Sequence, residues 1–420
     1  MRNKPFRHSV ALVIITALLA ILIMGLAVST SFAATTSFPD VPSSNPYHTA
    51  ITNLAASGII SGYTNGSFGP NDPVTRQQFA KMIDLALGLQ VKESDFPNSA
   101  VPFVDLGPDI SNNLYPHEYV ADAALNGLTN GTDSTHFSPL LNINHAQVVL
   151  MVQRAGGSGS TPAGWKSTGD ATRGEVAWML YTLRNESKVE LKVSAASSLK
   201  GAFTDIAAAF DKSHHSTTTF NFDASGTLQK QIEAGAPVDA FASAAVTQVN
   251  ALLNEGLAIR SSRRYFAGNE ICLVVPATST LGITSFLDLT KSSVKRVGYG
   301  DPAIAPHGVA AEEVLHHLGI YDQVKPKVIY AANVTQALQY VTSGEVDAGI
   351  IFTTEAYTAG NKVKIVAVSD PSWHSTIAYP IAALTKSKHV ALATAFCDYV
   401  NGPFGQAILA KYGFLPAPAL

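Results

Sequence analysis

The sequence predicts a chain of several domains, in which a small α-helical repeat domain precedes a larger α/β domain made of two lobes. At 420 residues the chain is too long for one ordinary hydrophobic core. A pattern of short helices and glycine loops recurs between residues 38 and 184, whereas short apolar strands alternate with longer helices from residue 189 onward. The first pattern indicates helical repeats, and the second indicates mixed sheets covered by helices.

Residues 1–34 are predicted to be a secretory signal peptide rather than part of a fold. Basic residues at positions 2, 4 and 7 precede the apolar run 10–28, and small residues at 31–33 suit a signal peptidase. Because the run is long enough to cross a bilayer, an uncleaved membrane anchor is the alternative. No cysteine lies near the cleavage region, so a lipoprotein anchor is excluded.

Two copies of one motif order occupy residues 35–90 and 91–155. Each copy has a Phe-x-Asp turn, a helix, a glycine loop, a Phe-x-Pro turn and a second helix. Thr75 and Asn144 are the expected N-caps of the second helices. Residues 156–188 hold a Gly- and Ser-rich stretch, expected to be a flexible linker, and a truncated third copy whose helix follows Thr172.

This motif order resembles the S-layer homology repeats that fasten exported proteins to secondary polymers of bacterial cell walls. The resemblance implies a groove between repeats, in which the arginine of a Thr-Arg-Ala-Glu motif faces an acidic sugar. The expected polymer-binding residues are Asp40, Arg76, Asp105 and Arg173, whereas His145 replaces the arginine in the second copy. A guanidinium suits carboxylates because it donates a fork of hydrogen bonds. The alternative is that both arginines are solvated residues of a first helical turn.

The elements of the α/β half follow one another in the order typical of two lobes. The expected strands are 190–194, 218–223, 240–243, 271–276, 296–299, 327–331, 348–352, 364–368 and 379–384. The expected helices are 199–212, 227–234, 245–255, 309–318, 334–343, 389–400 and 402–411. Two lobes account for this order if the chain crosses between them near Gly268 and returns near Tyr379.

The amino-acid composition limits the classes of partner and of metal site that we expect for this protein. Charged residues make up 14% and the formal net charge is −3, so nothing favours nucleic acid or anionic lipid. Cys272 and Cys397 are the only cysteines. We expect them to be separate buried thiols, although one disulfide is possible on the count alone. Two cysteines are too few for a zinc or iron–sulfur site built on soft ligands.

Four turns in the α/β half end in small, hydroxyl-bearing or amide-bearing residues and then open into helices. They are Ser197-Ser198, Ser225-Gly226-Thr227, His307-Gly308 and Asn333-Val334-Thr335. The first turn of a helix leaves backbone N–H groups without intrahelical partners and carries the positive end of the helix dipole. If these turns converge, they form a site for an ionised oxyanion. The alternative is that each polar residue is an ordinary N-cap.

This half resembles the molybdate-binding component of ABC importers. The matching segments are 195–199, 225–228, 231–239, 300–302, 349–352 and 411–414. The resemblance implies a two-lobed periplasmic-binding-protein fold of type II over residues 189–420. Lobe 1 is expected at about 189–268 and 379–420, and lobe 2 at about 269–378.

The resemblance also implies which residues bind the oxyanion. Ser198 and Ser225 match positions that offer a hydroxyl and a backbone N–H, and His307 and Val334 match positions that offer a backbone N–H. Phe352 matches a position where the family has a tyrosine, so a hydroxyl donor is missing there, unless the ring of His307 supplies an N–H in its place. The alternatives are that Phe352 belongs to the core and that His307 lies at the rim of the site.

The function implied is capture of molybdate or tungstate, held as the oxyanion without metal ligation, by a secreted protein attached to the cell wall that serves an ABC importer permease. No cofactor, nucleic-acid partner or enzymatic activity is expected. Sulfate is an alternative ligand, because its charge and shape are the same. Asp223, a possible acceptor for a protonated anion such as phosphate, is expected to face solvent. A wall-anchored polysaccharide-acting enzyme is a further alternative, but the pattern singles out no pair of catalytic carboxylates.

Overall fold

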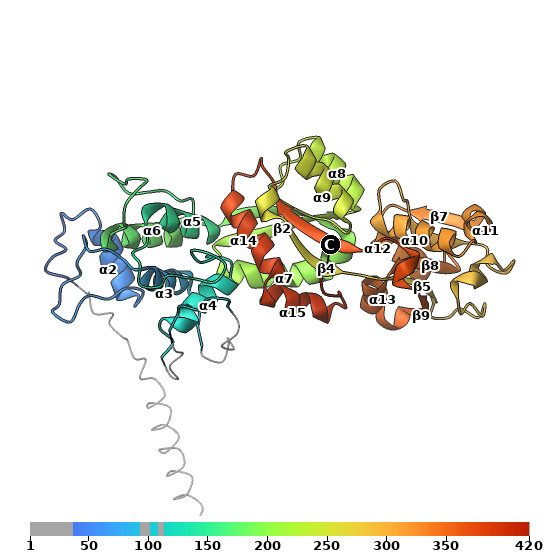
Figure 1. Ribbon diagram of the computed structural model, residues 1–420, viewed down its shortest axis with the longest axis horizontal. Helices are drawn as coiled ribbons and strands as arrows, with labels where there is room; N and C mark the ends of the chain where they lie inside the picture. The colour runs from blue at the N-terminus through green and yellow to red at the C-terminus, as the bar shows by residue number, and fades with distance from the viewer. Residues whose placement is uncertain (1–36, 93–100, 108–112, 420) are drawn as a thin grey trace, which may run out of the picture.

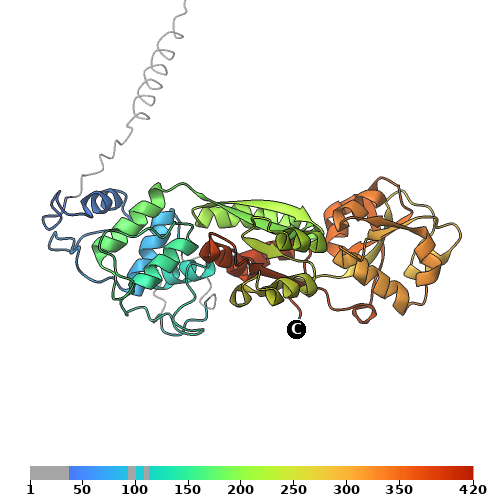
Figure 2. The same cartoon turned by 90° about the horizontal axis from the view of Figure 1, so that it is seen from above.

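A computed structural model describes residues 37–92, 101–107 and 113–419. The expected signal peptide lies outside these residues. Three parts follow one another in a row, the repeat domain, lobe 1 and lobe 2, and the same order is seen in both views (Figures 1 and 2). Within the described residues, no helix is long and apolar enough to cross a membrane.

The repeat domain spans residues 37–188, and its described residues form five α-helices around their own hydrophobic core. They are α2 (His48–Ala56), α3 (Arg76–Leu87), α4 (His117–Leu125), α5 (His145–Arg154) and α6 (Arg173–Asn185). The second helix of each unit starts with a capping box, at Thr75, Asn144 and Thr172, so the expected Thr and Asn caps are confirmed.

The residues just before these three capped helices pair with one another in a ring. Isolated antiparallel bridges join Pro73 to Thr172, Thr75 to Asn142, and Asn144 to Asp170. Each of the three units therefore contacts the other two, and the truncated third copy completes the ring within one chain.

The segment expected to be a flexible linker instead packs onto the domain. Trp165 lies against His145, with ring centroids 4.2 Å apart. Ser158 donates its backbone N–H to the Glu186 carboxylate at 2.7 Å. The glycines and serines therefore form an ordered connection, because the Trp165 side chain and the Ser158 backbone both find partners elsewhere in the domain.

Lobe 1 has a five-stranded mixed sheet in the order β2-β1-β3-β10-β4. The strands are β1 (Val189–Ala196), β2 (Ser216–Asp223), β3 (Ala240–Ala242), β4 (Arg264–Gly268) and β10 (Ala378–Ala383). The α-helices are α7 (Lys200–Ser213), α8 (Ser225–Glu233), α9 (Val246–Asn254), α14 (Val390–Asn401) and α15 (Pro403–Lys411). β1, β2 and β3 are parallel, whereas β10 runs antiparallel to β3 and β4.

Lobe 2 has a second five-stranded sheet in the order β7-β6-β8-β5-β9. The strands are β5 (Ile271–Pro276), β6 (Val297–Gly300), β7 (Val328–Ala331), β8 (Ala348–Phe352) and β9 (Val363–Val368). The α-helices are α10 (Pro306–His317), α11 (Tyr321–Val324), α12 (Val334–Thr342) and α13 (Thr353–Ala359). The chain passes from one lobe to the other between β4 and β5 and returns between β9 and β10.

Several features differ from the sequence-based expectation, and one confirms it. Strand β4 was not expected, and α8 and α10 begin two and three residues earlier than expected, at Ser225 and Pro306. Helix α13, directly after β8, was also not expected. Cys272 and Cys397 are both buried and unpaired, as expected.

Candidate functional site

The five residues expected to bind the oxyanion come together around one small pocket between the lobes. The pocket has a volume of about 10 Å³, far below the roughly 300–1,000 Å³ typical of pockets for larger organic ligands. The lining residues are Ala196, Ser197, Ser198, Asp223, Ala224, Ser225, Ala244, Ala305, Pro306, His307, Asn333, Val334 and Phe352. A peptide or an oligosaccharide does not fit this volume.

The Ser198 hydroxyl is oriented by a chain of buried hydrogen bonds. Asn269 uses both hydrogens of its amide, one toward the Thr354 hydroxyl at 2.9 Å and one toward the Tyr379 hydroxyl at 3.0 Å. The Tyr379 oxygen lies 3.1 Å from Ser198 Oγ. Tyr379 accepts from Asn269, whereas either hydroxyl of the Tyr379–Ser198 pair can be the donor. When Tyr379 donates, the proton of Ser198 is free for an acceptor in the pocket.

Burial keeps the Tyr379 phenol protonated, as these hydrogen bonds require. Tyr379 is fully buried, and burial raises the pKa of its phenol well above the usual value. The phenol is therefore neutral and donates at any pH near neutrality.

The hydroxyl of the second serine, Ser225, accepts a hydrogen bond from the backbone. Ser225 is fully buried, and its Oγ accepts the backbone N–H of Ala244 at 2.9 Å. Its hydroxyl proton is therefore free for an acceptor. Ser225 thus acts as a donor toward the pocket, and Ser198 does so when Tyr379 donates to it, which is the polarity that an anion needs.

Three α-helices direct their first turns at the pocket. Ser225 and Val334 are the first residues of α8 and α12, and His307 is the second residue of α10. Their backbone N–H groups belong to the set that has no partner inside the helix, and they carry the positive end of the helix dipole. Gly308 lets α10 approach β6, because a Cβ there would lie 2.0 Å from the Gly300 carbonyl oxygen.

Phe352 and His307 form an apolar wall on the lobe 2 side. Phe352 is 1% exposed and its ring centroid lies 5.7 Å from that of His307. His307 is 2% exposed, so it does not lie at an open rim. Burial lowers the pKa of His307 to about 3, and its Nε2 has no hydrogen-bond partner. The imidazole is therefore neutral at pH 7 and brings no positive charge to the pocket.

Two hydrogen bonds join the lobes at the mouth of the pocket. The Gly226 N–H donates to the Ile304 carbonyl at 2.9 Å, and the Asn333 side chain donates to the Asp223 carboxylate at 3.1 Å. Asp223 therefore does not face solvent as expected. It is half-buried and lines the pocket because its partner, Asn333, belongs to the opposite lobe. The structure is the closed arrangement of the two lobes.

Comparison with known proteins identifies the α/β half. The sequence profile of the bacterial extracellular solute-binding proteins matches residues 191–415, more than half of the chain. The chain belongs to this family. A second profile, that of the S-layer homology domain, matches residues 37–80 of this solute-binding protein.

Relatives of the solute-binding protein include molybdate-binding proteins. Over 231 residues it is 37% identical to the putative ABC transporter substrate-binding lipoprotein YvgL of Bacillus subtilis strain 168, a match that covers 55% of this chain and 88% of that protein. Over 238 residues it is 34% identical to the molybdate-binding protein ModA of Escherichia coli strain K12, covering 55% and 90%. The solved periplasmic molybdate-binding protein of Azotobacter vinelandii is 26% identical, with a TM-score of 0.50, and the match covers 54% of this chain and 100% of that one. The expected periplasmic-binding-protein fold is thereby confirmed.

Two further residues of the solute-binding protein's site were missed at the sequence level. Asn269 and Tyr379 lie where the chain crosses between the lobes, at the two crossings that the order of elements predicts. Polar residues at such crossings lie at the base of the cleft, where ligands bind between domains. Applied to the two predicted crossings, this rule could have identified Asn269 and Tyr379 from the sequence.

One carboxyl group near the site has no use in anion binding. Glu355 on α13 is 8% exposed, and burial raises its pKa to about 7. It lines a separate interlobe pocket that also includes Ser197 and Ser198. Among the residues that the structure describes, no group of three or more His, Cys, Asp or Glu side chains could hold a metal ion.

Three of the four expected polymer-binding residues of the solute-binding protein serve contacts inside the repeat domain. The Asp40 carboxylate accepts the backbone N–H groups of Phe68 and Gly69 at 2.8 and 2.7 Å. Asp105 does the same for Phe137 and Ser138 at 2.8 and 2.7 Å. Both carboxylates thereby hold the turn of their own repeat.

Arg76 is also internal, with only 3% of its surface exposed. Its Nε donates to the Phe137 carbonyl at 2.7 Å, and its guanidinium lies 4.7 Å from the Phe137 ring centroid. A buried guanidinium that stacks on the next repeat cannot reach a polymer in this arrangement. Its expected role in polymer binding is therefore replaced by a role in joining two repeats.

Arg173 alone of the four lines an open groove. It donates to the carbonyls of Phe68 at 2.8 Å and Ser61 at 2.7 Å, and its guanidinium lies 4.8 Å from the Tyr63 ring centroid. The groove has a volume of about 270 Å³ and also includes Gln78, Lys81, Met82 and Tyr115. Arg173 and Lys81 give this groove two cationic groups.

Proposed function

We propose that this solute-binding protein captures molybdate or tungstate outside the cell and delivers it to an ABC importer permease. One observation supports this proposal above the others. The Ser225 hydroxyl in the closed pocket accepts the Ala244 N–H, so its proton is left for the guest, and the Ser198 hydroxyl can do the same when Tyr379 donates to it. The names of the relatives in Bacillus subtilis and Escherichia coli point to the same class of solute.

The energetics favour a fully ionised anion. A hydrogen bond to a charged acceptor contributes about 1.5–3 kcal/mol, so two hydroxyls and several helix-start N–H groups offset the dehydration of a dianion. No cationic side chain lines the pocket. The charge is met by dipoles instead, as at other helix N-termini that bind anions.

A second candidate is a singly protonated oxyanion such as hydrogenphosphate. Asp223 lines the pocket, and a carboxylate oxygen can accept the proton that such an anion carries. Molybdate, tungstate and sulfate near neutral pH carry no proton, so they gain nothing from this acceptor.

Calorimetric titration of the full chain with molybdate, tungstate, sulfate and phosphate, side by side, tests the proposal. We expect molybdate and tungstate to bind more tightly than the other two. Preferential binding of phosphate would move the assignment to the second candidate. Absence of binding by all four anions would refute an oxyanion site.

We also propose that the repeat domain attaches the protein to an acidic cell-wall polymer through the groove around Arg173. The Arg173→Gln variant is expected to sediment less with purified cell walls than the unmodified chain, because one of two groove cations is lost. Lys166→Gln is the matched control, since Lys166 is exposed and lies outside the groove. Equal sedimentation of the Arg173 variant and the control would exclude this groove.

The role proposed is binding rather than catalysis. The relatives named above are binding proteins of transporters, and the pocket offers donors and one carboxylate rather than a nucleophile with its base.

A further inference from the structure

The repeat domain lacks one helix of its third unit. The first unit supplies α2 and α3 and the second supplies α4 and α5, whereas the third supplies only α6 among the described residues. The helices pack in pairs across the units: α3 lies against α4, and α6 lies against α2. In each pair, the second helix of one unit meets the first helix of the next. By the same rule, α5 should contact the first helix of the third unit. The described residues of the third unit contain no such helix.

Helix α14 of lobe 1 lies against α5 at that place. The two helices are in direct contact, and both views show α14 between the repeat domain and the lobe 1 sheet (Figures 1 and 2). Gly127, with φ of 74°, follows α4, and a Cβ there would lie 3.0 Å from the Ala395 carbonyl oxygen of α14. Such a close approach requires glycine, for reasons of both space and backbone conformation.

Polar contacts fix the same interface. The His215 N–H donates to the Ala155 carbonyl at 2.7 Å, and His215 Nε2 lies 2.8 Å from the Glu186 carbonyl oxygen. Arg154 on α5 is largely buried and is attracted by Asp398 on α14, which also pairs with Arg264 at 2.7 Å. A loop of lobe 1 and one of its helices thus both contact the repeat domain.

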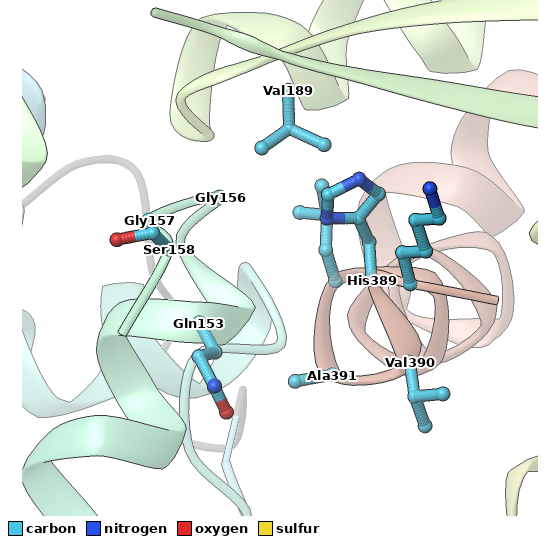
Figure 3. A pocket seen from close by; sticks show the side chains of 10 residues that line it. Gln153, Gly156, Gly157, Ser158, Val189, His389, Val390 and Ala391 are labelled. Atoms are coloured by element: carbon cyan, nitrogen blue, oxygen red, sulfur yellow. The ribbon is translucent and has the colours of Figure 1, made fainter. Parts of the chain in front are cut away.

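The contact is concentrated in the second half of α14. Near its start, a cleft of about 310 Å³ separates the two domains. Figure 3 shows Gln153, Gly156 and Ser158 on one side, and His389 and Ala391 on the other. Substitutions meant to separate the domains therefore belong near Arg154, beyond this cleft.

We infer that α14 takes the place of the missing repeat helix, so that the repeat domain and lobe 1 form one rigid body. Lobe 2 lies at the far end of the molecule in both views. It is joined to lobe 1 by the two chain crossings and by the interlobe contacts of the closed form. Lobe 2 is then the part that moves relative to the wall. Only this last step, ligand-driven motion, rests on the proposed function.

Distance measurements between spin labels on the full chain test the inference. Exposed positions Ala56 in the repeat domain, Asn254 in lobe 1 and Glu345 in lobe 2 accept single cysteines. The native thiols are buried and stay unlabelled. We expect a narrow distance distribution for Ala56→Cys with Asn254→Cys, unchanged by molybdate. The pair Ala56→Cys with Glu345→Cys should shift when molybdate is added.

The outcomes separate this inference from the proposed function. A broad distribution between the repeat domain and lobe 1 would overturn the rigid body, whatever the anion does. A narrow distribution supports the rigid body even if molybdate moves nothing, and in that case the failure belongs to the proposed oxyanion function.

Thermal unfolding gives a second test that needs no ligand. After Trp373→Phe, the remaining tryptophans, Trp165 and Trp178, both report on the repeat domain. We expect their fluorescence and the circular dichroism of the whole chain to change in one transition. Arg154→Glu puts a second carboxylate beside Asp398 and should shift the fluorescence transition to lower temperature, ahead of the rest.

Arg260→Glu is the matched control, because it makes the same charge change at an exposed position of lobe 1. It should leave the single transition in place. Two separate transitions in the Trp373→Phe chain itself, unaffected by Arg154→Glu, would show that the domains unfold independently and would overturn the inference.

Discussion

Gly226 gives a direct test of whether the closed pocket is the ligand-binding form. Its N–H donates to the Ile304 carbonyl of the opposite lobe at 2.9 Å. In the variant Gly226→Ala, the new Cβ would lie 2.7 Å from that oxygen and 2.9 Å from the Ile304 Cα. Ordinary contacts begin at about 3.4 Å, so the lobes must part by a few tenths of an ångström or more.

The magnitude follows from the cost of overpacking, which is about 1–3 kcal/mol. Because the clash exists only when the lobes are closed, the whole cost falls on the bound form. The dissociation constant should therefore rise by a factor of roughly 5 to 150. The open form gains a better helix former at this position, so the melting temperature without ligand should not fall.

Calorimetry with whichever of molybdate, tungstate and sulfate binds most tightly measures the first quantity, and thermal unfolding without anion measures the second. Gln231→Ala, an exposed neutral change on the same helix, is the control and should bind normally. Unchanged affinity in Gly226→Ala would refute the reasoning, because the bound form would then lack the contact between Gly226 and Ile304.

Three further predictions concern one residue that lines the pocket and two buried residues near it. Phe352→Tyr adds a hydroxyl where the related family has one, so molybdate should bind roughly 10-fold or more tightly by calorimetry; no gain would remove Phe352 from the residues that touch the anion. Tyr379→Phe removes the hydroxyl that pairs with Ser198, and we expect the affinity to fall by a factor of about 2 to 12 with the fold intact. Full affinity would show that Ser198 needs no orientation. Glu355→Gln should raise the melting temperature at pH 8 but not at pH 4. The pKa of Glu355 is raised from 4.5 to about 7 in the folded state, so the folded state of the unmodified protein loses stability as the pH rises through this window, by roughly 3 kcal/mol at most. Equal melting temperatures of Glu355→Gln and the unmodified protein at pH 8 would contradict this cost of burial.

The sequence predicted the order of the lobes well because strand and helix patterns are local. It also placed Ser198, Ser225, His307, Val334 and Phe352 in one set, and the structure brings them around one pocket. What local patterns could not predict was the start of a helix to within two or three residues. That difference matters here, because it decides that Ser225 and His307 lie inside first turns rather than before them.

Interactions between distant segments explain the remaining differences. Asp223 turns toward the pocket because Asn333, far away in the sequence, donates to it. Arg76 is a first-turn arginine that a local reading leaves in solvent, yet the ring and carbonyl of Phe137 bury it. Strand β4 has no regular alternation, and it forms because β10 returns from lobe 2 to pair with it. In each case the deciding partner is contributed by another unit of the fold.

The amide groups that open α8, α10 and α12 belong to the main chain, and this has an evolutionary consequence. A point mutation to any residue other than proline replaces a side chain but keeps the peptide N–H, so positions such as 307 and 334 tolerate drift in residue identity while the donor persists. Comparing side chains alone would therefore underestimate how far anion capture is preserved among distant homologues. Conversely, retuning the preferred ion requires shifting whole helices, which few single substitutions achieve.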